Sequence, residues 1–331
     1  MGQKFWTKER WTDSTGATGC RLSFTRAPQN SLWLRRPATI RPIEYDDFYC
    51  TLAKDDAVPM AVKHVHCDRF MSGGQFAIEG GPFEIYALLY VPARSSLGSR
   101  GSRGPALKSH KQLQLYVSNA HVPHCCDDLL PSWLNMIWGL VDIADIDFYV
   151  ARGSVREHKV RVLRELLTGK CLEMFEDLTK SKGVYAQFYT FFADHLELGA
   201  YKDTVYRKQL VELLRFTTTK SLFIISLKEY VERMKDKQKY IFYIPGTSRV
   251  AAPAPIMNWL DKQGIEAMHV TSPIAVGALQ RVSVYCDIPF RSTVEAEHFA
   301  LQEAQYRHEQ DRLEQLAEQD RHESLTKKRK T

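Results

Sequence analysis

The sequence lacks the long apolar segments that membrane proteins and secreted precursors require. No apolar run approaches the roughly 20 residues of a transmembrane helix, and the N-terminus has no apolar core of the signal-peptide kind. Cysteine is scarce, because the 331 residues include only seven, without any Cys-x-x-Cys pair. These features favour free thiols in a reducing compartment. We therefore expect a cytoplasmic location, with a mitochondrial one as the alternative because residues 1–31 are poor in acids.

The net charge of +6 belongs to one end of the chain. Residues 1–41 contain eight Lys or Arg and two Asp or Glu, so the remaining residues are neutral in sum. This excess does not make the folded body a nucleic-acid binder. A loop at residues 94–111 repeats Arg and Gly, which hints at RNA, but a solvated loop is the preferred interpretation. Nucleic acid is therefore not an expected partner, and RNA binding is kept only as a minor alternative.

No metal site is predicted. The segment His-Val-Pro-His-Cys-Cys at residues 121–126 holds four metal-capable side chains, but its adjacent cysteines lack the usual zinc-ligand spacing. His64 and His66 share one strand face and are expected to be exposed rather than ligands. Gly246-Thr247-Ser248 follows a strand but lacks the G-x-x-x-x-G-K-[ST] phosphate-binding pattern. We interpret it as a turn.

The periodicity predicts an α/β protein. Strands are expected within residues 61–92, 113–117, 240–244 and 267–270, and helices at 43–52, 183–198, 207–216, 227–234 and 256–263. Ser226 and Glu229 form the pattern of a capping box before the helix at 227–234. The strand, helix and strand between residues 240 and 270 predict a parallel βαβ unit with a right-handed crossover.

The stretch from Pro131 to Leu178 organises the chain. It predicts a buried helix, a turn, an exposed loop and then a long amphipathic helix. The apolar residues of the long helix recur at steps of three and four: Val160, Leu163, Leu167, Cys171, Met174 and Leu178. Gly169 is a weak point in this helix, at a cost of about 1 kcal/mol against Ala.

These segments carry a resemblance to the middle domain of the heat-shock protein 90 chaperone family. The matching pieces are Leu130-Pro131-Ser132-Trp133-Leu134-Asn135, Gly139-Leu140-Val141-Asp142, Arg152, Lys170-Cys171-Leu172-Glu173-Met174-Phe175, Arg207-Lys208, Leu213-Leu214-Arg215-Phe216, Ser226-Leu227-Lys228-Glu229-Tyr230-Val231 and Arg233-Met234-Lys235. The resemblance covers roughly residues 32–281, and the order and spacing of the pieces make it specific. It implies an ATP-dependent chaperone that binds client proteins and cochaperones and takes part in protein folding and the stress response.

The resemblance also implies the site residues. Arg152 matches the arginine that the family's middle domain offers to the γ-phosphate of ATP held by an N-terminal domain, and Trp33 matches an aromatic residue used for client contact. Trp33 can equally be a core anchor. The chain contains neither the nucleotide-binding motifs nor the dimerisation domain of the family. We therefore expect no autonomous ATPase, and ATP with Mg²⁺ only through a partner nucleotide-binding domain.

The loop around Arg152 departs from the family. Tyr149, Ala151, Gly153 and Arg156 stand where the family has Asn, Ser, Glu and Gln, and Trp138 replaces an Arg. The alternative function is therefore a non-catalytic structural or interaction subunit of a larger complex. Five segments are predicted: 1–31 disordered or linker, 32–165 a larger α/β subdomain of α-β-α sandwich type, 166–225 a helical connector, 226–290 a smaller α-β-α unit and 291–331 a long charged helical tail.

Overall fold

The chain divides into two compact units, Met1–Gly199 and Ala200–Thr331. The computed structural model describes residues 9–12, 18–21, 31–54, 57–67, 84–93, 112–122, 128–144, 154–221, 223–235, 238–246 and 254–293. Arg152, the Arg-Gly loop and the predicted tail beyond residue 293 lie outside these residues. Among the described helices none is both long and apolar enough to cross a membrane.

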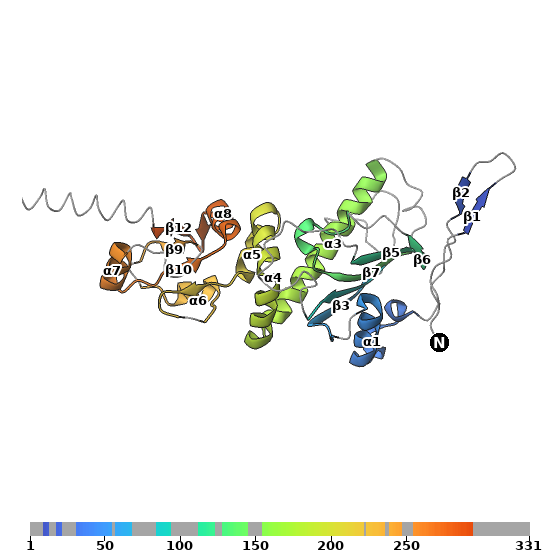
Figure 1. The fold of residues 1–331 in the computed structure, drawn as a ribbon, viewed down its shortest axis with the longest axis horizontal. Helices are drawn as coiled ribbons and strands as arrows, with labels where there is room; N and C mark the ends of the chain where they lie inside the picture. Colours follow the sequence, from blue (N-terminus) through green and yellow to red (C-terminus); the bar gives the residue numbers. More distant parts are fainter. Residues whose placement is uncertain are drawn as a thin grey trace, which may run out of the picture. The chain divides into compact units, whose positions relative to one another are not determined.

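A five-stranded mixed sheet forms the centre of the first unit (Figure 1). Its order is β3-β4-β7-β5-β6. The strands are β3 (Ala61–Cys67), β4 (Ile85–Val91), β5 (Leu113–Val117), β6 (Ala120–Val122) and β7 (Trp138–Ile143). All neighbours are antiparallel except β5 and β7, which run parallel. The last of these strands in the chain, β7, therefore occupies the middle of the sheet.

The helix predicted immediately after Pro131 is wrong. Residues Ser132–Leu134 form a short 3-10 turn, η3, and the following residues form β7. A continuous apolar run of this length fits a buried strand as well as a buried helix, so periodicity did not separate the two. The strand requires glycine at position 139, because its φ of +154° suits glycine, and a Cβ there would lie 2.0 Å from the Leu88 carbonyl oxygen.

Helices cover both faces of this sheet (Figure 1). On one side lie η1 (Leu32–Leu34), η2 (Pro37–Thr39) and α1 (Pro42–Ala53), and on the other lies α3 (Ser154–Thr179). The apolar stripe predicted for α3 is confirmed, because Leu163, Leu167 and Cys171 are fully buried. Lys63 of β3 forms two ion pairs with the polar side of α3. Its Nζ lies 3.3 Å from Glu173 Oε2 and 3.4 Å from Asp177 Oδ2. This arrangement confirms the predicted α-β-α sandwich.

The segment before residue 31 contains a short hairpin. Strands β1 (Glu9–Thr12) and β2 (Thr18–Arg21) pair antiparallel, with Glu9 opposite Arg21 and Thr12 opposite Thr18.

The next two helices in the chain after α3 lie close to their predicted bounds. Helix α4 (Lys182–Lys202) extends the predicted span by a few residues, and α5 (Arg207–Leu213) ends earlier than predicted.

The second unit is built on another five-stranded sheet, of order β11-β12-β9-β10-β8. Its strands are β8 (Thr217–Thr218), β9 (Ile241–Pro245), β10 (Met268–Val270), β11 (Val284–Tyr285) and β12 (Ile288–Ser292), and its helices beyond α5 are α6 (Leu227–Glu232), α7 (Ala254–Gln263) and α8 (Pro273–Val282). β9 and β10 are parallel and joined through α7, which confirms the predicted βαβ unit. β8 and the end of β12 extend this sheet into the segments predicted as connector and tail.

Candidate functional site

The first candidate residue, Arg152, lies outside the described residues. Strand β7 ends at Ile143 and α3 begins at Ser154, so Arg152 belongs to the connection between the central strand and the long helix. The described part of α3 is firmly held by its buried stripe. The role of Arg152 stays a prediction.

The second candidate, Trp33, is a core residue in the structure. Its side chain is 6% exposed and packs with Tyr49, Leu88, Tyr90 and Leu140. The indole also lies against two further rings, with centroid distances of 5.9 Å to Phe48 and 5.2 Å to Tyr116. Trp33 therefore anchors η1 to the sheet, and its contact with clients stays a prediction.

A buried carboxylate fixes the orientation of this indole. Trp33 Nε1 donates to Asp142 Oδ2 at 2.9 Å, and the backbone N–H of Asn119 donates to Asp142 Oδ1 at 3.2 Å. Asp142 lies in the central strand and is 2% exposed. Burial raises the pKa of its carboxyl, while the Trp33 and Asn119 donors act in the opposite direction. The pair links η1, β7 and the turn between β5 and β6.

His64 extends the same network to α1, and it is half-buried rather than exposed as predicted. Its Nε2 lies 3.1 Å from the Trp33 carbonyl oxygen, which can only accept, so Nε2 carries the proton. Nδ1 then accepts from the Tyr45 hydroxyl at 2.8 Å. Burial lowers the pKa of His64, which keeps the ring neutral. His66 is exposed and stacks on Tyr86 with ring centroids 4.4 Å apart.

The other metal-capable residues form no ligand cluster in the part of the chain that the structure describes. There, no group of three or more His, Cys, Asp or Glu side chains is placed to hold an ion. Within the segment singled out in the sequence, His121 is described and is partly buried, while His124, Cys125 and Cys126 lie outside the described residues.

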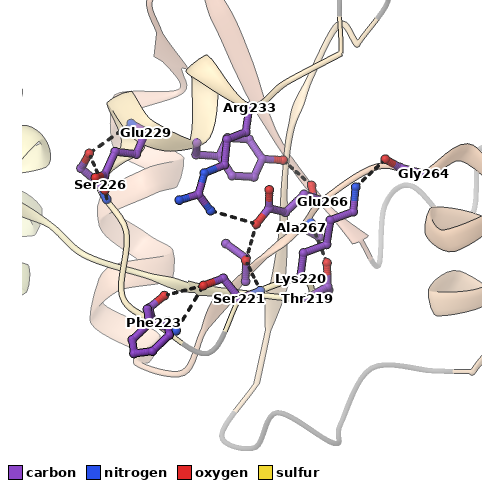
Figure 2. A network of polar contacts seen from close by, with 12 residues as sticks. Thr219, Lys220, Ser221, Phe223, Ser226, Glu229, Arg233, Gly264, Glu266 and Ala267 are labelled. Atoms are coloured by element: carbon purple, nitrogen blue, oxygen red, sulfur yellow. Dashed lines mark hydrogen bonds and ion pairs between the residues drawn. The ribbon is translucent and has the colours of Figure 1, made fainter.

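A second polar network lies in the second unit, around Glu266 (Figure 2). Glu266 is 8% exposed, and its Oε1 accepts from the hydroxyl of Thr218 and lies 3.9 Å from Arg233 Nη1. The Tyr230 hydroxyl donates to the Glu266 carbonyl oxygen at 2.5 Å. The network therefore connects β8, α6 and the segment that leads into β10.

The predicted capping box of α6 belongs to the same region and is confirmed. Ser226 Oγ accepts from the Glu229 backbone N–H at 3.1 Å, and Glu229 Oε2 accepts from the Ser226 N–H at 3.0 Å.

Two lysines from other segments of the second unit bind the carboxyl end of α7. Lys220 Nζ donates to Gly264 O at 2.8 Å, and Lys235 Nζ donates to Gln263 O at 2.6 Å. Cations are stabilising at this end of a helix dipole.

Asp142 and Glu266 were not predicted from the sequence as network centres. Asp142 offered a signal, because it is a charged residue inside the otherwise apolar run from Ile137 to Ile143. A charge in a buried strand requires hydrogen-bond donors. Glu266 stands in a mixed segment and offered no comparable signal. Both networks use their donors and acceptors to join distant segments of each unit.

The fold is similar to that of a solved heat shock protein domain. The middle domain of a putative heat shock protein of Plasmodium falciparum superposes with a TM-score of 0.65 at 19% identity, covering 80% of this chain and 99% of that domain. The sequence profile of the family described as "Hsp90 protein" matches residues 25–331. The chain belongs to the Hsp90 family.

Whole relatives agree with this assignment. Heat shock protein 83 of Leishmania donovani is 34% identical over 272 residues, which is 81% of this chain and 57% of that protein. The endoplasmin homolog of Hordeum vulgare is 32% identical over 79% of this chain and 34% of its own length. The chaperone protein HtpG of Chlorobaculum tepidum is 31% identical over 81% of this chain and 41% of its own length. The chain thus spans between about a third and somewhat more than half of these relatives.

Proposed function

We propose that this chain acts as the middle segment of an Hsp90-type chaperone, which binds client proteins and cochaperones and assists protein folding. The observation that carries the proposal is the similarity of fold, which extends over 99% of a heat shock protein's middle domain. The family assignment over residues 25–331 supports it. We also propose a cytoplasmic location for the chain, with a mitochondrial location as the alternative.

Arg152 is the proposed contact with ATP. A guanidinium is always charged and offers a planar fork of donors that suits the oxygens of a γ-phosphate. Such a group, supplied by one domain to a nucleotide bound by another, stabilises the charge of the phosphoryl group during its transfer. The support within this chain is the anchored helix α3, which begins two residues after Arg152. ATP and Mg²⁺ are proposed to be held by a partner nucleotide-binding domain.

Trp33 is the proposed client contact, and its burial sets a condition on that role. An indole that is 6% exposed reaches a client only if η1 moves away from the sheet. That movement breaks the hydrogen bond to Asp142 and the contacts with Phe48 and Tyr116. Client binding through Trp33 is therefore coupled to opening of the η1 segment.

The test is ATPase activity after addition of a purified nucleotide-binding domain of the family. Wild-type chain is expected to raise the turnover of that domain, and Arg152→Ala is expected to abolish the increase. Arg152→Lys keeps the charge but loses the fork, so it should restore only part of the increase. Arg161→Ala, at an exposed arginine of α3, is the matched control and should behave like the wild type. Equal stimulation by wild type and Arg152→Ala would remove the ATPase role.

A second function is favoured by the altered sequence around Arg152. Tyr149, Ala151, Gly153 and Arg156 cannot reproduce the polar loop of the family, and Arg156 lacks an acceptor oxygen. The chain would then be a structural or interaction subunit of a larger complex. Co-purification in a fixed stoichiometry that does not change with nucleotide or client would support this alternative, and exchange driven by nucleotide would contradict it.

A further inference from the structure

The loop between β8 and α6 exposes the most accessible large apolar side chain of the described residues. Phe223 is 84% exposed, and its neighbour Ile224 is 36% exposed. Large apolar side chains usually contact other apolar groups, and exposed aromatic residues are enriched at binding hot spots. Figure 2 shows Phe223 at the margin of the Glu266 network, on the loop that carries Ser221. We define the exposed pair Phe223 and Ile224 as the Phe223 site.

The backbone on both sides of this site is fixed by hydrogen bonds. Phe223 N donates to Ser221 Oγ at 3.2 Å, and Ser221 N donates to Thr218 Oγ1 at 3.0 Å. Phe216 and Ile225 then close the loop through reciprocal backbone bonds of 2.9 and 2.8 Å. The ring is therefore carried by a hydrogen-bonded loop, so less backbone entropy is lost when a partner binds than for an unrestrained loop.

The segment that carries the site is basic. Among its described residues from 215 to 239, six are Lys or Arg and two are acidic, namely Arg215, Lys220, Lys228, Arg233, Lys235, Lys239, Glu229 and Glu232. Glu229 accepts hydrogen bonds in the capping box of α6 and keeps its negative charge. Arg233 lies 3.9 Å from Glu266, so the positive excess comes from the four lysines and Arg215. Lys228 is exposed at the start of α6, four residues from Ile224. An apolar anchor on a segment with an excess of positive charge fits a partner that combines apolar and acidic groups.

We propose that the Phe223 site is a docking site for an extended acidic peptide segment that carries an apolar anchor residue. The anchor packs on Phe223 and Ile224, and the acidic residues are attracted by Lys228 and the neighbouring cations. A peptide fits better than a nucleic acid, because Ile224 offers aliphatic surface rather than a second ring for stacking.

The proposed docking does not depend on the chaperone role, because its readout is peptide binding to the chain alone. The experiment is fluorescence anisotropy with the full chain and labelled synthetic peptides of equal length. The probes are an acidic peptide with one central Leu, the same peptide with Ser in place of Leu, and a basic peptide with Leu. A labelled single-stranded oligonucleotide represents the competing class of partner.

The acidic peptide with Leu is expected to bind at least tenfold more tightly than the other two peptides and the oligonucleotide. Phe223→Ser should weaken that binding by about tenfold or more. Val205→Ser is the matched control, because Val205 is 77% exposed in the same unit, and it should leave binding unchanged. Lys228→Glu should weaken binding, and added salt should weaken it further, whereas Lys208→Glu on α5 should have a smaller effect.

Three results would overturn the proposal. They are equal binding of all the peptides, tighter binding of the oligonucleotide, and an unchanged affinity in Phe223→Ser. A fourth result would also overturn the proposed acidic peptide. If sedimentation shows that the wild type self-associates and that Phe223→Ser does not, a second copy of the chain occupies the site. Phe223 is largely exposed, so its variant should fold, and circular dichroism verifies this before binding is measured.

Discussion

Trp33 and Asp142 are 109 residues apart in the chain and are joined by a hydrogen bond of 2.9 Å in the core of the first unit. The bond fastens a short N-terminal segment to the central strand of the sheet. It is charge-assisted when Asp142 is ionised, and both partners are buried. The contribution of this hydrogen bond to the free energy of unfolding can be measured by removing its donor.

Trp33→Phe removes the donor and leaves the Asp142 carboxylate with one fewer partner. We expect the free energy of unfolding to fall by about 1.5–3 kcal/mol more than in Trp138→Phe. Trp138 is the matched control, because it packs in the same cluster and its Nε1 has no hydrogen-bond partner among the described residues. Urea denaturation measures both variants, and equal losses would show that the bond contributes little.

His195 of α4 predicts a pH dependence of stability. Both ring nitrogens are buried without a hydrogen-bond partner in the described part of the chain, and burial lowers the pKa of the ring although Asp194 acts in the opposite direction. The unfolded chain therefore binds the proton first as the pH falls below about 6.5. The contribution of the neutral His195 ring to the free energy of unfolding is fully present above about pH 6.5. It is lost as the pH falls from there through the lower pKa of the folded state.

His195→Phe keeps the edge contact with Phe192, whose ring centroid is 6.0 Å away, and removes the titrating group. We expect it to stabilise the protein by about 1 kcal/mol at neutral pH, because two unpaired buried nitrogens disappear. The free energy of unfolding should also fall less between about pH 7 and pH 5 in this variant than in the wild type. His66→Gln, at an exposed position, is the control, and an unchanged pH profile in His195→Phe would contradict the prediction.

Two glycines should respond to alanine in opposite directions. Gly169 lies inside α3 and has room for a methyl group, since no atom lies within 4 Å of the position that a Cβ would take. Gly169→Ala should therefore stabilise the protein by about 1 kcal/mol. Gly139→Ala should destabilise it severely, because the Cβ would meet the Leu88 carbonyl oxygen of β4. Thermal unfolding distinguishes the two, and similar melting temperatures would refute the assignment of Gly139 to a close strand contact.

The cap of α6 gives a prediction for the second unit. Ser226→Ala should cost about 1 kcal/mol, because it leaves the Glu229 N–H unbonded and breaks the capping box. Ser272→Ala, at the cap of α8, should cost less, because its Oγ accepts one longer bond of 3.4 Å from Ala275 N. The comparison uses urea midpoints, and a larger loss in Ser272→Ala would contradict this ranking.

Local signals in the sequence were sufficient for most helices and for the βαβ unit. The stripe of α3 and the capping box of α6 each depend on residues that are only a few positions apart in the chain. β7 was assigned wrongly because a buried strand and a buried helix share the same apolar run. Its strand conformation depends on β4 and β5, which lie elsewhere in the chain.

The candidate site was less predictable than the fold. Neither the partner of Trp33 nor that of Glu266 follows from local spacing, because the two hydrogen bonds join residues that are 109 and 48 positions apart. The half-burial of His64 also depends on α1 and η1 folding over β3. The family resemblance, in contrast, rested on the order of many short pieces, and the profile match confirmed it.

The position of β7 has a consequence for how the first unit assembles during synthesis. β7 is the last of its five strands to leave the ribosome, yet it pairs with β4 on one side and β5 on the other. Until residues 138–143 emerge, both of those strands present open edges, which are templates for pairing with other chains. Nascent chains that end before β7 should therefore aggregate, and those that extend into α3 should resist aggregation.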